Sequence, residues 1–254
     1  MPPVFLSIVV PAYNEEGRLG TTLLTLTEYL RDQPWSWEVR VVDDGSTDAT
    51  VRVADAAASL EPRIVLQREP HRGKGGAVKA GLLAARGQFR FICDADLSMP
   101  VSEVVRFLPP LAPPFDVAIG SREGVKARRI GEPAYRHVAG RLFNLGVQWL
   151  VLPGVEDSQC GFKMFTADAV ESIFPRVSVD GWAFDVEVLA IARARKLRIV
   201  ELPIEWHYRA ESRLNMLRDG WQMLRELLRI RLRAMRGAYG DDAGVGGAGR
   251  SARS

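Results

Sequence analysis

The sequence predicts an α/β protein built on a mostly parallel sheet with helices on both faces. In the first half of the chain, short runs rich in β-branched and aromatic residues alternate with stretches of helical periodicity. This alternation is typical of parallel sheets, in which ligands bind beyond the carboxyl ends of the strands. The chain has 254 residues, of which 47% are hydrophobic and 26% are charged, and this length and composition suit one large globular domain.

The elements expected in the first half follow from these runs in chain order. Strands are expected over 5–10, 37–42, 63–67, 89–93 and 115–120. In the first connection, leucines recur at a spacing of three or four residues, which predicts a helix over 19–30. The other connections predict helices over 48–59, 75–86 and 101–108.

After residue 120 the pattern changes. We expect, in order, a polar loop over 121–133, a largely apolar helix over 135–150, a loop entering a strand over 154–165, a helix over 181–196, a strand over 197–206 and a strong helix over 214–236. The segment that follows cannot bury enough surface to order itself. The predicted organisation is a catalytic domain over 1–212, an amphipathic helix over 213–236 and a disordered tail over 237–254.

Composition and charge argue against several classes of protein. Lysine and arginine number 34 against 31 acidic residues, and a net charge of +3 does not indicate a nucleic-acid partner. Cys93 and Cys160 form neither a disulfide framework nor a zinc spacing, which favours a reducing compartment such as the cytoplasm. The first residues lack the basic start of a signal peptide, and no run reaches the roughly 18 apolar residues of a spanning helix.

Polar clusters follow four of the predicted strands: "PAYNEE" (11–16), "DDGSTD" (43–48), "HRGKGG" (71–76) and "DADLS" (94–98). Because the carboxyl ends of parallel strands share one edge of a sheet, these clusters should gather there. So many acids on one edge favour a divalent cation, which binds carboxylate and phosphate oxygens. Asp94 and Asp96 are two residues apart, so in an extended segment both can face one metal ion.

Some of these side chains have a simpler explanation. An aspartate after a strand is often a helix cap or a turn residue, and we expect this of Ser46 and Asp48. The cluster at 71–76 is not a G-x-x-x-x-G-K-[ST] phosphate loop, and no G-x-G-x-x-G follows the first strand. The sequence motifs therefore do not support ATP hydrolysis or dinucleotide binding.

In this order and spacing, "SIVVPAYNEE", "VVDDGSTDAT", "GKGGAVKAG" and "DADLS" resemble the family 2 glycosyltransferases, which have the nucleotide-sugar-binding GT-A fold. In the second half, "IGSR", "EDSQCGFKMF", "GWAFDVEVLAIA" and "LLRIRLRAM" are similar to the dolichyl-phosphate β-glucosyltransferases. The resemblance runs from about residue 6 to 236. It implies a metal-dependent, inverting transfer of glucose from UDP-glucose to a polyprenyl or dolichyl phosphate.

The resemblance also implies roles for individual residues. The uracil and ribose would be bracketed by Pro11, Tyr13, Glu15, Asp43 and Asp44. Asp94 and Asp96 would be the catalytic "DxD" pair, one directed toward the sugar and ribose and one toward Mg²⁺ or Mn²⁺. Lys74 and Arg122 would face phosphates. The sequence departs from the mannosyl relatives at Ser98, where these often have a Gln as a further metal ligand, and from the eukaryotic glucosyl enzymes in the membrane anchor at their start, which we do not expect here.

The acceptor decides which other side chains are needed. A lipid phosphate is largely dianionic at pH 7 and requires cations rather than a base. A basic segment beside the site offers Arg122, Lys126, Arg128 and Arg129, although a solvated charged loop would have the same composition. A hydroxyl acceptor requires a base, for which Asp157 is the candidate unless it only forms a turn. Trp182 and Asp185 are candidates for lining the cleft between sugar and acceptor.

The last helix has a basic stripe. Within about 80° of one another on a helical wheel lie Arg218, Arg225, Arg229, Arg233 and Arg236. On the other side lie Leu217, Trp221, Leu224, Leu228 and Met235. The pattern predicts an interfacial helix on anionic lipid, which would hold the protein peripherally on the cytoplasmic face of a membrane. Packing of this helix on its own domain is the alternative, and the helix over 135–150 would lie beside the same surface or form a homodimer.

Two other functions remain open at this level. A related transferase could use another sugar nucleotide, such as GDP-mannose, or a soluble acceptor, and it would then have no use for the basic stripe. A catalytically silent nucleotide-sugar-binding membrane scaffold is the second alternative. The intact pair of Asp94 and Asp96 argues against the scaffold.

Overall fold

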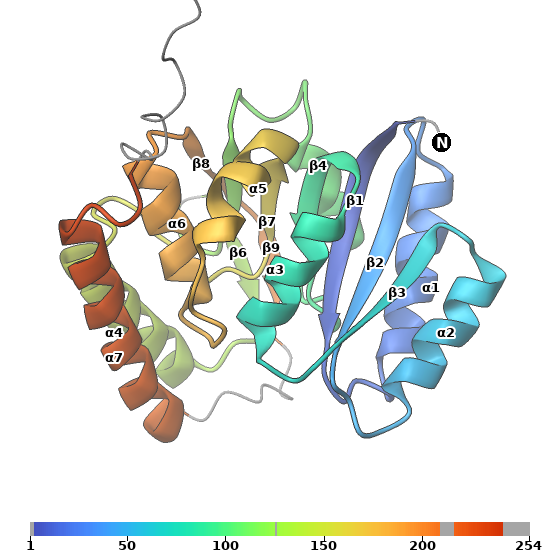
Figure 1. Cartoon of the computed structure of the whole chain (residues 1–254), viewed down its shortest axis with the longest axis horizontal. Coiled ribbons are helices and arrows are strands. Elements are labelled where there is room, and N and C mark those ends of the chain that lie inside the picture. Colours follow the sequence, from blue (N-terminus) through green and yellow to red (C-terminus); the bar gives the residue numbers. More distant parts are fainter. Residues whose placement is uncertain (1–2, 125, 209–215, 241–254) are drawn as a thin grey trace, which may run out of the picture.

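The computed structural model describes residues 3–124, 126–208 and 216–240, with residues 216–221 described by their backbone alone. The described residues form a seven-stranded sheet of order β3-β2-β1-β4-β7-β5-β8 (Figure 1). Its strands are β1 (Val4–Ala12), β2 (Trp37–Asp44), β3 (Ile64–Glu69), β4 (Gly87–Ile92), β5 (Val117–Ser121), β7 (Lys163–Thr166) and β8 (Ile199–Pro203). Only β7 runs antiparallel to its neighbours, β4 and β5. The expected mostly parallel sheet is confirmed.

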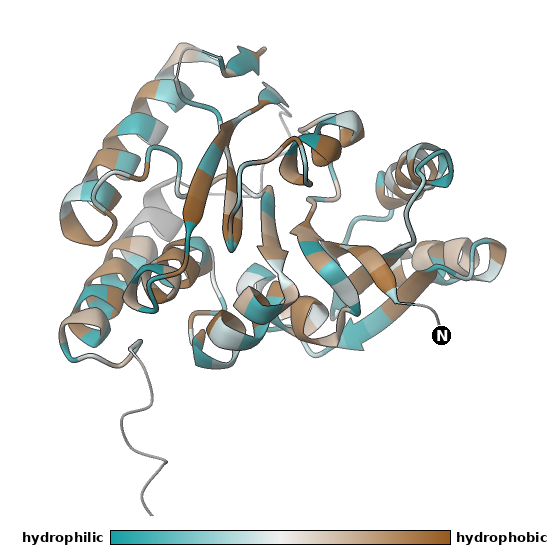
Figure 2. Ribbon diagram, turned by 90° about the horizontal axis from the view of Figure 1, so that it is seen from above, coloured by the Kyte–Doolittle hydropathy of each residue, from teal (hydrophilic) through white to brown (hydrophobic). Residues whose placement is uncertain are grey.

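Helices cover both faces of this sheet because apolar strand residues alternate between the two sides. In β1, Ile8 and Val10 face one layer and Val9 faces the other. The first layer contains α1 (Leu19–Arg31), α2 (Thr50–Leu60) and the 3-10 helix η1 (Val101–Phe107). The second contains α3 (Lys74–Ala84), α5 (Ala167–Ile173), the short 3-10 helix η2 (Phe174–Arg176) and α6 (Phe184–Ala194). Figure 2 shows how strongly hydrophobic residues concentrate on the strands between these layers.

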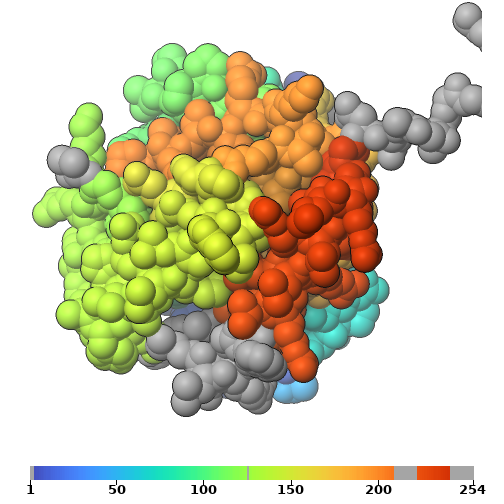
Figure 3. All heavy atoms as spheres, turned by 90° about the vertical axis from the view of Figure 1, so that its left-hand side faces the viewer, coloured from blue at the N-terminus to red at the C-terminus, as the bar shows by residue number. Residues whose placement is uncertain are grey.

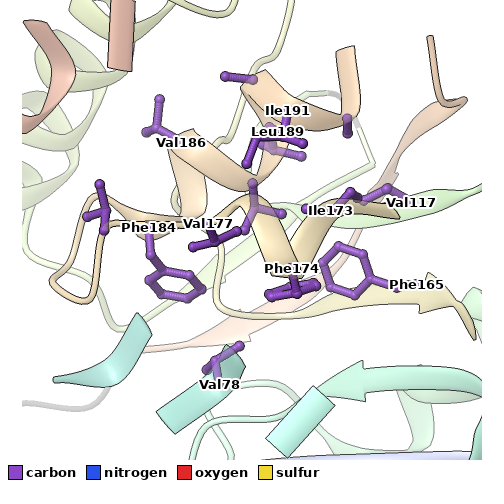
Figure 4. Packing of buried hydrophobic residues seen from close by; sticks show 14 of the residues in the cluster. Val78, Val117, Phe165, Ile173, Phe174, Val177, Phe184, Val186, Leu189 and Ile191 are labelled. Carbon is purple, nitrogen blue, oxygen red and sulfur yellow. The ribbon is translucent and has the colours of Figure 1, made fainter. Parts of the chain in front are cut away.

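Aromatic packing joins the second layer to the sheet. Phe165 of β7 meets Phe174 of η2 edge to face, with ring centroids 5.3 Å apart and an interplanar angle of 82° (Figure 4). Val78 of α3 and Phe184 of α6 belong to the same buried cluster. Burying one such phenylalanine stabilises the fold by roughly 1.5–3 kcal/mol. This packing fixes the positions of β7 and α6, which carry the charged side chains of Lys163 and Asp185.

The second half of the chain differs in four places from what its sequence predicts. The expected loop over 121–133 contains a short strand, β6 (Arg128–Ile130), and the expected strand over 197–206 divides into β8 and β9 (Glu205–His207). The division occurs because Ile204 donates its N–H to Ser121 but accepts at its C=O from Arg128, which transfers the chain from one sheet to the next. The expected helix over 181–196 begins only at Phe184, and α5 was not expected at all.

Two helices pack side by side at one end of the molecule, α4 (Ala134–Leu150) and α7 (Met216–Met235) (Figure 3). Both were expected from sequence. In the described part of the chain, no helix is long and apolar enough to cross a membrane.

The tail was expected to be disordered from residue 237, and this boundary needs correction. Tyr239 is completely buried, and its hydroxyl donates a 2.8 Å hydrogen bond to Glu187 of α6. Gly237 permits the turn that leads there, because its φ of +71° is one that other residues rarely adopt. Residues 241–254 lie outside the described part of the chain.

Candidate active site

A cleft of about 750 Å³ opens beyond the carboxyl ends of β1, β2 and β4. Of the site residues expected from sequence, it is lined by Pro11, Tyr13, Glu15, Asp44, Lys74, Asp94, Asp96, Arg122, Arg129, Asp157, Trp182 and Asp185. Three expected residues, Asp43, Lys126 and Arg128, are not among the described residues that line it. Residues up to 174 positions apart in sequence (Pro11 and Asp185) therefore meet around one cavity, as a parallel sheet requires of its strand ends.

An aromatic pair forms one wall of the cleft. The rings of Tyr13 and His71 stack with centroids 4.2 Å apart and planes 18° from parallel. Nδ1 of His71 lies 2.8 Å from the Asp44 carboxylate, which also accepts the N–H groups of Arg72 and Gly73, each at 2.9 Å. Asp44 therefore shapes the loop that carries His71 and leads into α3. His71 was not predicted as a site residue, because only the tertiary structure brings its ring against that of Tyr13.

Two of the expected acids serve the turns around this wall. Asp43 is buried, and its carboxylate accepts the N–H of Ser46. Asp48 accepts the N–H of Thr50 at 2.9 Å and its hydroxyl at 2.5 Å just before α2, which confirms the expected turn role of this residue; the N-cap position of α2 itself is Ala49. Burial acts to raise the pKa of Asp48, but the bonds from Thr50 outweigh it and lower the pKa below the ordinary 3.8.

The centre of the cleft contains a lysine between carboxylates. Nζ of Lys74, in the first turn of α3, lies 2.6 Å from Oδ1 of Asp94. Asp96 accepts the N–H of Ser98 at Oδ1, at 2.9 Å. Burial acts to lower the pKa of Lys74, but the charges of Asp94, Asp185 and Asp96 outweigh it and raise the pKa, so the ammonium is charged at neutral pH.

A glycine explains how a loop comes so close to Asp94. A Cβ at Gly161 would collide with the Asp94 carboxylate, so only glycine fits there. Gly161 belongs to "SQCGFK", the segment that leads into β7. The close approach brings this segment into the wall of the cleft.

The carboxylates at the centre suit a divalent cation that is shared with a substrate. Within residues 3–124, 126–208 and 216–240, no three His, Cys, Asp or Glu side chains come together as a complete metal site. Mg²⁺, however, is commonly bound by one or two carboxylates together with substrate phosphates and water. Asp94 and Asp96 would provide two such carboxylates, and Ser98, buried in the same cleft, would leave the remaining positions to phosphate and water.

A buried ion pair stands at the other end of the cleft. Asp157 accepts three hydrogen bonds from Arg122, at 2.9 Å from the backbone N–H, 2.7 Å from Nε and 2.8 Å from Nη2. Burial acts to raise the pKa of Asp157, but the Arg122 charge and hydrogen bonds outweigh it and hold the pKa below its ordinary value. A carboxylate that is ionised, buried and fully engaged is a poor general base.

The basic segment after β5 is divided between the cleft and the solvent. Arg129 lines the cleft and pairs with Glu123 and Glu132. Arg128 is exposed and pairs with Glu205, and Lys126 is exposed. The alternation follows from β6, in which neighbouring side chains point to opposite sides.

The structure adds site residues that the sequence analysis missed. Arg136 of α4 lines the cleft with its guanidinium 5.3 Å from the ring of Tyr208, and its Nε has no hydrogen-bond partner in the described part of the chain. The wall beside it consists of Ala139, Gly140 and Phe143 of α4 and Met223 of α7. No motif marks these helix residues, since their place depends on how the helices pack.

This arrangement of sheet, cleft and carboxylate pair is that of the GT-A glycosyltransferases. Solved structures with the same fold include glucosyl-3-phosphoglycerate synthase from Mycobacterium tuberculosis in complex with UDP, with a TM-score of 0.65 and 21% identity over 96% of this chain and 83% of that one. Mannosyl-3-phosphoglycerate synthase from Rubrobacter xylanophilus has a TM-score of 0.64 and 21% identity over 92% of this chain and 74% of that one.

The family model described as "Glycosyl transferase family 2" matches residues 7–174, and the chain belongs to this family. Dolichyl-phosphate β-glucosyltransferase of Homo sapiens is 36% identical over 254 residues, which cover 94% of this chain and 78% of the relative. The enzyme of the same name from Dictyostelium discoideum is 32% identical over 250 residues, or 93% and 76% of the two chains. The expected resemblance is confirmed, and the chain is a glycosyltransferase.

Proposed function

We propose that this glycosyltransferase transfers glucose from UDP-glucose to a polyprenyl or dolichyl phosphate, with inversion at the anomeric carbon. The observation that carries the proposal is the buried pair of Arg122 and Asp157, which offers the acceptor a cation and engages the carboxylate that sequence had suggested as a base. A phosphate acceptor needs this arrangement, since it is already ionised. The names of the relatives at 32% and 36% identity support the same acceptor and sugar.

At the donor end, the residues suit a nucleoside diphosphate sugar. The stacked rings of Tyr13 and His71 offer an aromatic wall for the base. Lys74 provides a positive charge for the diphosphate, whose negative charge grows as its bond to the sugar breaks. Asp96, together with Asp94, would hold Mg²⁺ or Mn²⁺, and the bound ion would neutralise that charge further. Glucosyl-3-phosphoglycerate synthase, which shares the fold, has been crystallised with Mn²⁺ and UDP-glucose.

At the acceptor end, the phosphate would meet three arginines. Asp157 orients Arg122, and the glutamates beside Arg129 hold its side chain in place. Arg136 contributes an Nε that has no partner among the described residues. An acceptor held here would attack the sugar from the side opposite to the diphosphate, which gives inversion. Lys126 and Arg128, which sequence had grouped with them, lie outside the cleft lining, so we assign them no contact with the phosphate.

A soluble phosphorylated acceptor is the second candidate, because glucosyl-3-phosphoglycerate synthase has also been crystallised with phosphoglyceric acid. The surface around the cleft favours a lipid. α4 has Leu142 and Trp149 exposed by 65% and 83%, and α7 has Leu228 and Met235 exposed by 47% and 71%. Exposed apolar groups concentrated on one face mark an interaction surface.

We propose that this apolar face rests on a membrane. α4 and α7 lie side by side there (Figure 3), and the same two helices provide Gly140, Phe143 and Met223 to the cleft wall. A prenyl chain could therefore pass from the bilayer into the cleft without crossing open water. Such a lipid-facing position would make the enzyme peripheral, and we propose the cytoplasmic face, where UDP-sugars and anionic lipids are available.

The basic stripe of α7 supports this orientation in part. Arg225, Arg229 and Arg236 are exposed, and each arginine near an anionic surface contributes about 1 kcal/mol. Arg233 instead turns inward, where it lies 3.4 Å from Glu187, so it leaves the predicted stripe. Arg218, Leu217 and Trp221 lie outside the residues whose side chains are described.

Transfer of labelled sugar tests the reaction. We expect a lipid-linked product from UDP-glucose and a short polyprenyl phosphate with Mg²⁺ or Mn²⁺, and none with EDTA. GDP-mannose and 3-phosphoglycerate serve as the competing donor and acceptor. A product formed only with the soluble acceptor would replace the proposal by the second candidate, and UDP-glucose binding without any transfer would support a silent scaffold.

Liposome flotation tests the membrane surface. The double substitution Leu142→Ser with Trp149→Ser should abolish binding to anionic vesicles, whereas Leu60→Ser, on α2 and 84% exposed, should leave it unchanged. If the apolar face instead forms a homodimer, sedimentation velocity would show a dimer that these substitutions convert to a monomer, while flotation would be absent from the start.

A further inference from the structure

Lys163 has no exposed surface, although it is charged and lies in the middle of the sheet. Its strand, β7, places it opposite Ile92 of β4 and Ile119 of β5. Lysine is almost never completely buried unless it is paired. Nζ donates to the carboxylate of Asp185, at 2.5 Å from Oδ1, and to the backbone oxygen of Cys160.

The partner of this lysine faces the cleft. Asp185, in the first turn of α6, lines the cavity, whereas Lys163 is not among the described residues that do so. The structure gives Oδ2 of Asp185 no hydrogen-bond partner among the described residues, while Oδ1 is taken by Lys163. Lys163 therefore reaches the cleft through the carboxylate of Asp185, while its second bond holds the backbone of Cys160.

The surroundings of Asp185 favour a neutral, hydroxyl-rich ligand. Toward the centre of the cleft, Asp185 is followed by the ion pair of Lys74 and Asp94. Negative, positive and negative charges therefore succeed one another along this part of the wall. A carboxylate repels a phosphate but accepts hydrogen bonds well from hydroxyls. Trp182, 39% exposed in the same wall, presents an apolar face beside it. A carboxylate next to an aromatic face suits the ring of a sugar.

We propose that Lys163 is a positioning residue for the donor sugar, which holds Oδ1 of Asp185 and so turns the free oxygen of that carboxylate toward a hydroxyl of the sugar. The inference rests on the proposed function and adds a residue to it. A buried ion pair can often be replaced by apolar groups without loss of stability, so packing alone does not explain why two charges are retained here. A sugar-binding carboxylate does explain them, because it must stay charged and fixed in direction.

Isothermal titration calorimetry with UDP and with UDP-glucose distinguishes a sugar-positioning role of Lys163 from a structural one, because only UDP-glucose carries the sugar. Lys163→Met keeps the length of the side chain and removes its charge. We expect the affinity of this variant for UDP-glucose to fall about tenfold, which corresponds to the loss of one hydrogen bond to a charged group. Its affinity for UDP should stay within about twofold of the wild type. Asp185→Asn should show the same pattern. Lys79→Met, at a lysine that bonds Val177 outside the cleft lining, should match the wild type for both ligands.

The double variant tests whether Lys163 acts through Asp185. In the Asp185→Asn background, Lys163→Met should cause no further loss of UDP-glucose affinity. The double variant also leaves no unpaired buried charge, so it should fold even if Lys163→Met alone does not. Additive losses, or equal losses for UDP and UDP-glucose in the folded variants, would overturn the proposal. A wild type that binds no UDP-glucose would overturn the proposed function itself.

Discussion

Arg122 and Asp157, 35 residues apart in sequence, form a three-bonded ion pair in which the arginine donates from its backbone N–H and from two nitrogens, Nε and Nη2, on one edge of its guanidinium. The side chain of Asp157 is only 5% exposed and that of Arg122 20%, so the pair is mostly removed from water. An ion pair in such a place holds one arrangement, since breaking it leaves an unpaired buried charge. The aspartate that sequence offered as a base is thus occupied in orienting Arg122 within the cleft.

The substitution Asp157→Asn tests this relationship. We expect kcat/KM for polyprenyl phosphate to fall about 100-fold, because Arg122 loses its partner and its direction. The KM for UDP-glucose should change by less than about twofold, since the donor binds at the other end. Initial rates with each substrate varied in turn provide the measurement. A loss confined to kcat that high pH restores would point to a base instead.

The metal assignment predicts the effect of Asp96→Asn. Transfer should fall by about 10²–10³ while the melting temperature stays unchanged, because the variant loses charge stabilisation of the diphosphate and no packing. EDTA should inactivate the wild type to the same level and have no further effect on the variant. Asp48→Asn, which weakens the turn that precedes α2, should lower stability by about 1 kcal/mol and leave turnover intact. Near-normal turnover of Asp96→Asn would remove the metal from this position.

Glu61 makes stability depend on pH. The pKa of Glu61 is lowered from 4.5 to about 2. Side-chain hydrogen bonds from Arg63 lower it most, burial opposes them, and hydrogen bonds from Arg31 lower it further. Because the pKa is lower in the folded protein, the stabilisation is complete above pH 4.5 and is lost as the pH falls toward 2. Glu61→Gln should therefore be less stable than the wild type at pH 7, and the difference should shrink between pH 4.5 and 2. Urea unfolding across this range measures it, and a constant difference would contradict the assignment.

Tyr239 ties the segment after α7 to the domain. Its hydroxyl bonds the completely buried Glu187, which also accepts the N–H groups of Ser178 and Val179 at 2.7 Å each. Tyr239→Phe should lower the free energy of unfolding by about 1–3 kcal/mol, because Glu187 keeps its burial and loses a donor. Tyr135→Phe, at a position 67% exposed, is the matched control and should change it by less than about 0.5 kcal/mol. Equal effects of the two in denaturant unfolding would argue against the anchor.

The sequence by itself determined the class of fold and the centre of the site. Strand and helix periodicity are local properties, and they predicted the parallel sheet and most of its helices. The pair of Asp94 and Asp96 was predictable because strand ends of a parallel sheet share one edge, so residues that follow strands must meet there. The turn-forming role of Asp48 was predictable from local sequence, since its partner Thr50 is two residues away.

Only the tertiary structure decided how the charged side chains are used. Asp44 turns to the N–H groups of Arg72 and Gly73, Arg233 turns inward to Glu187, and Lys163 is buried against Asp185. Each of these partners comes from a segment at least 20 residues away, and no local pattern specifies which face of a packed helix or loop will meet it. The energy of a charge depends on burial and on the nearest opposite charge. Both are properties of the folded chain, so the roles of these residues could be assigned only after packing was known.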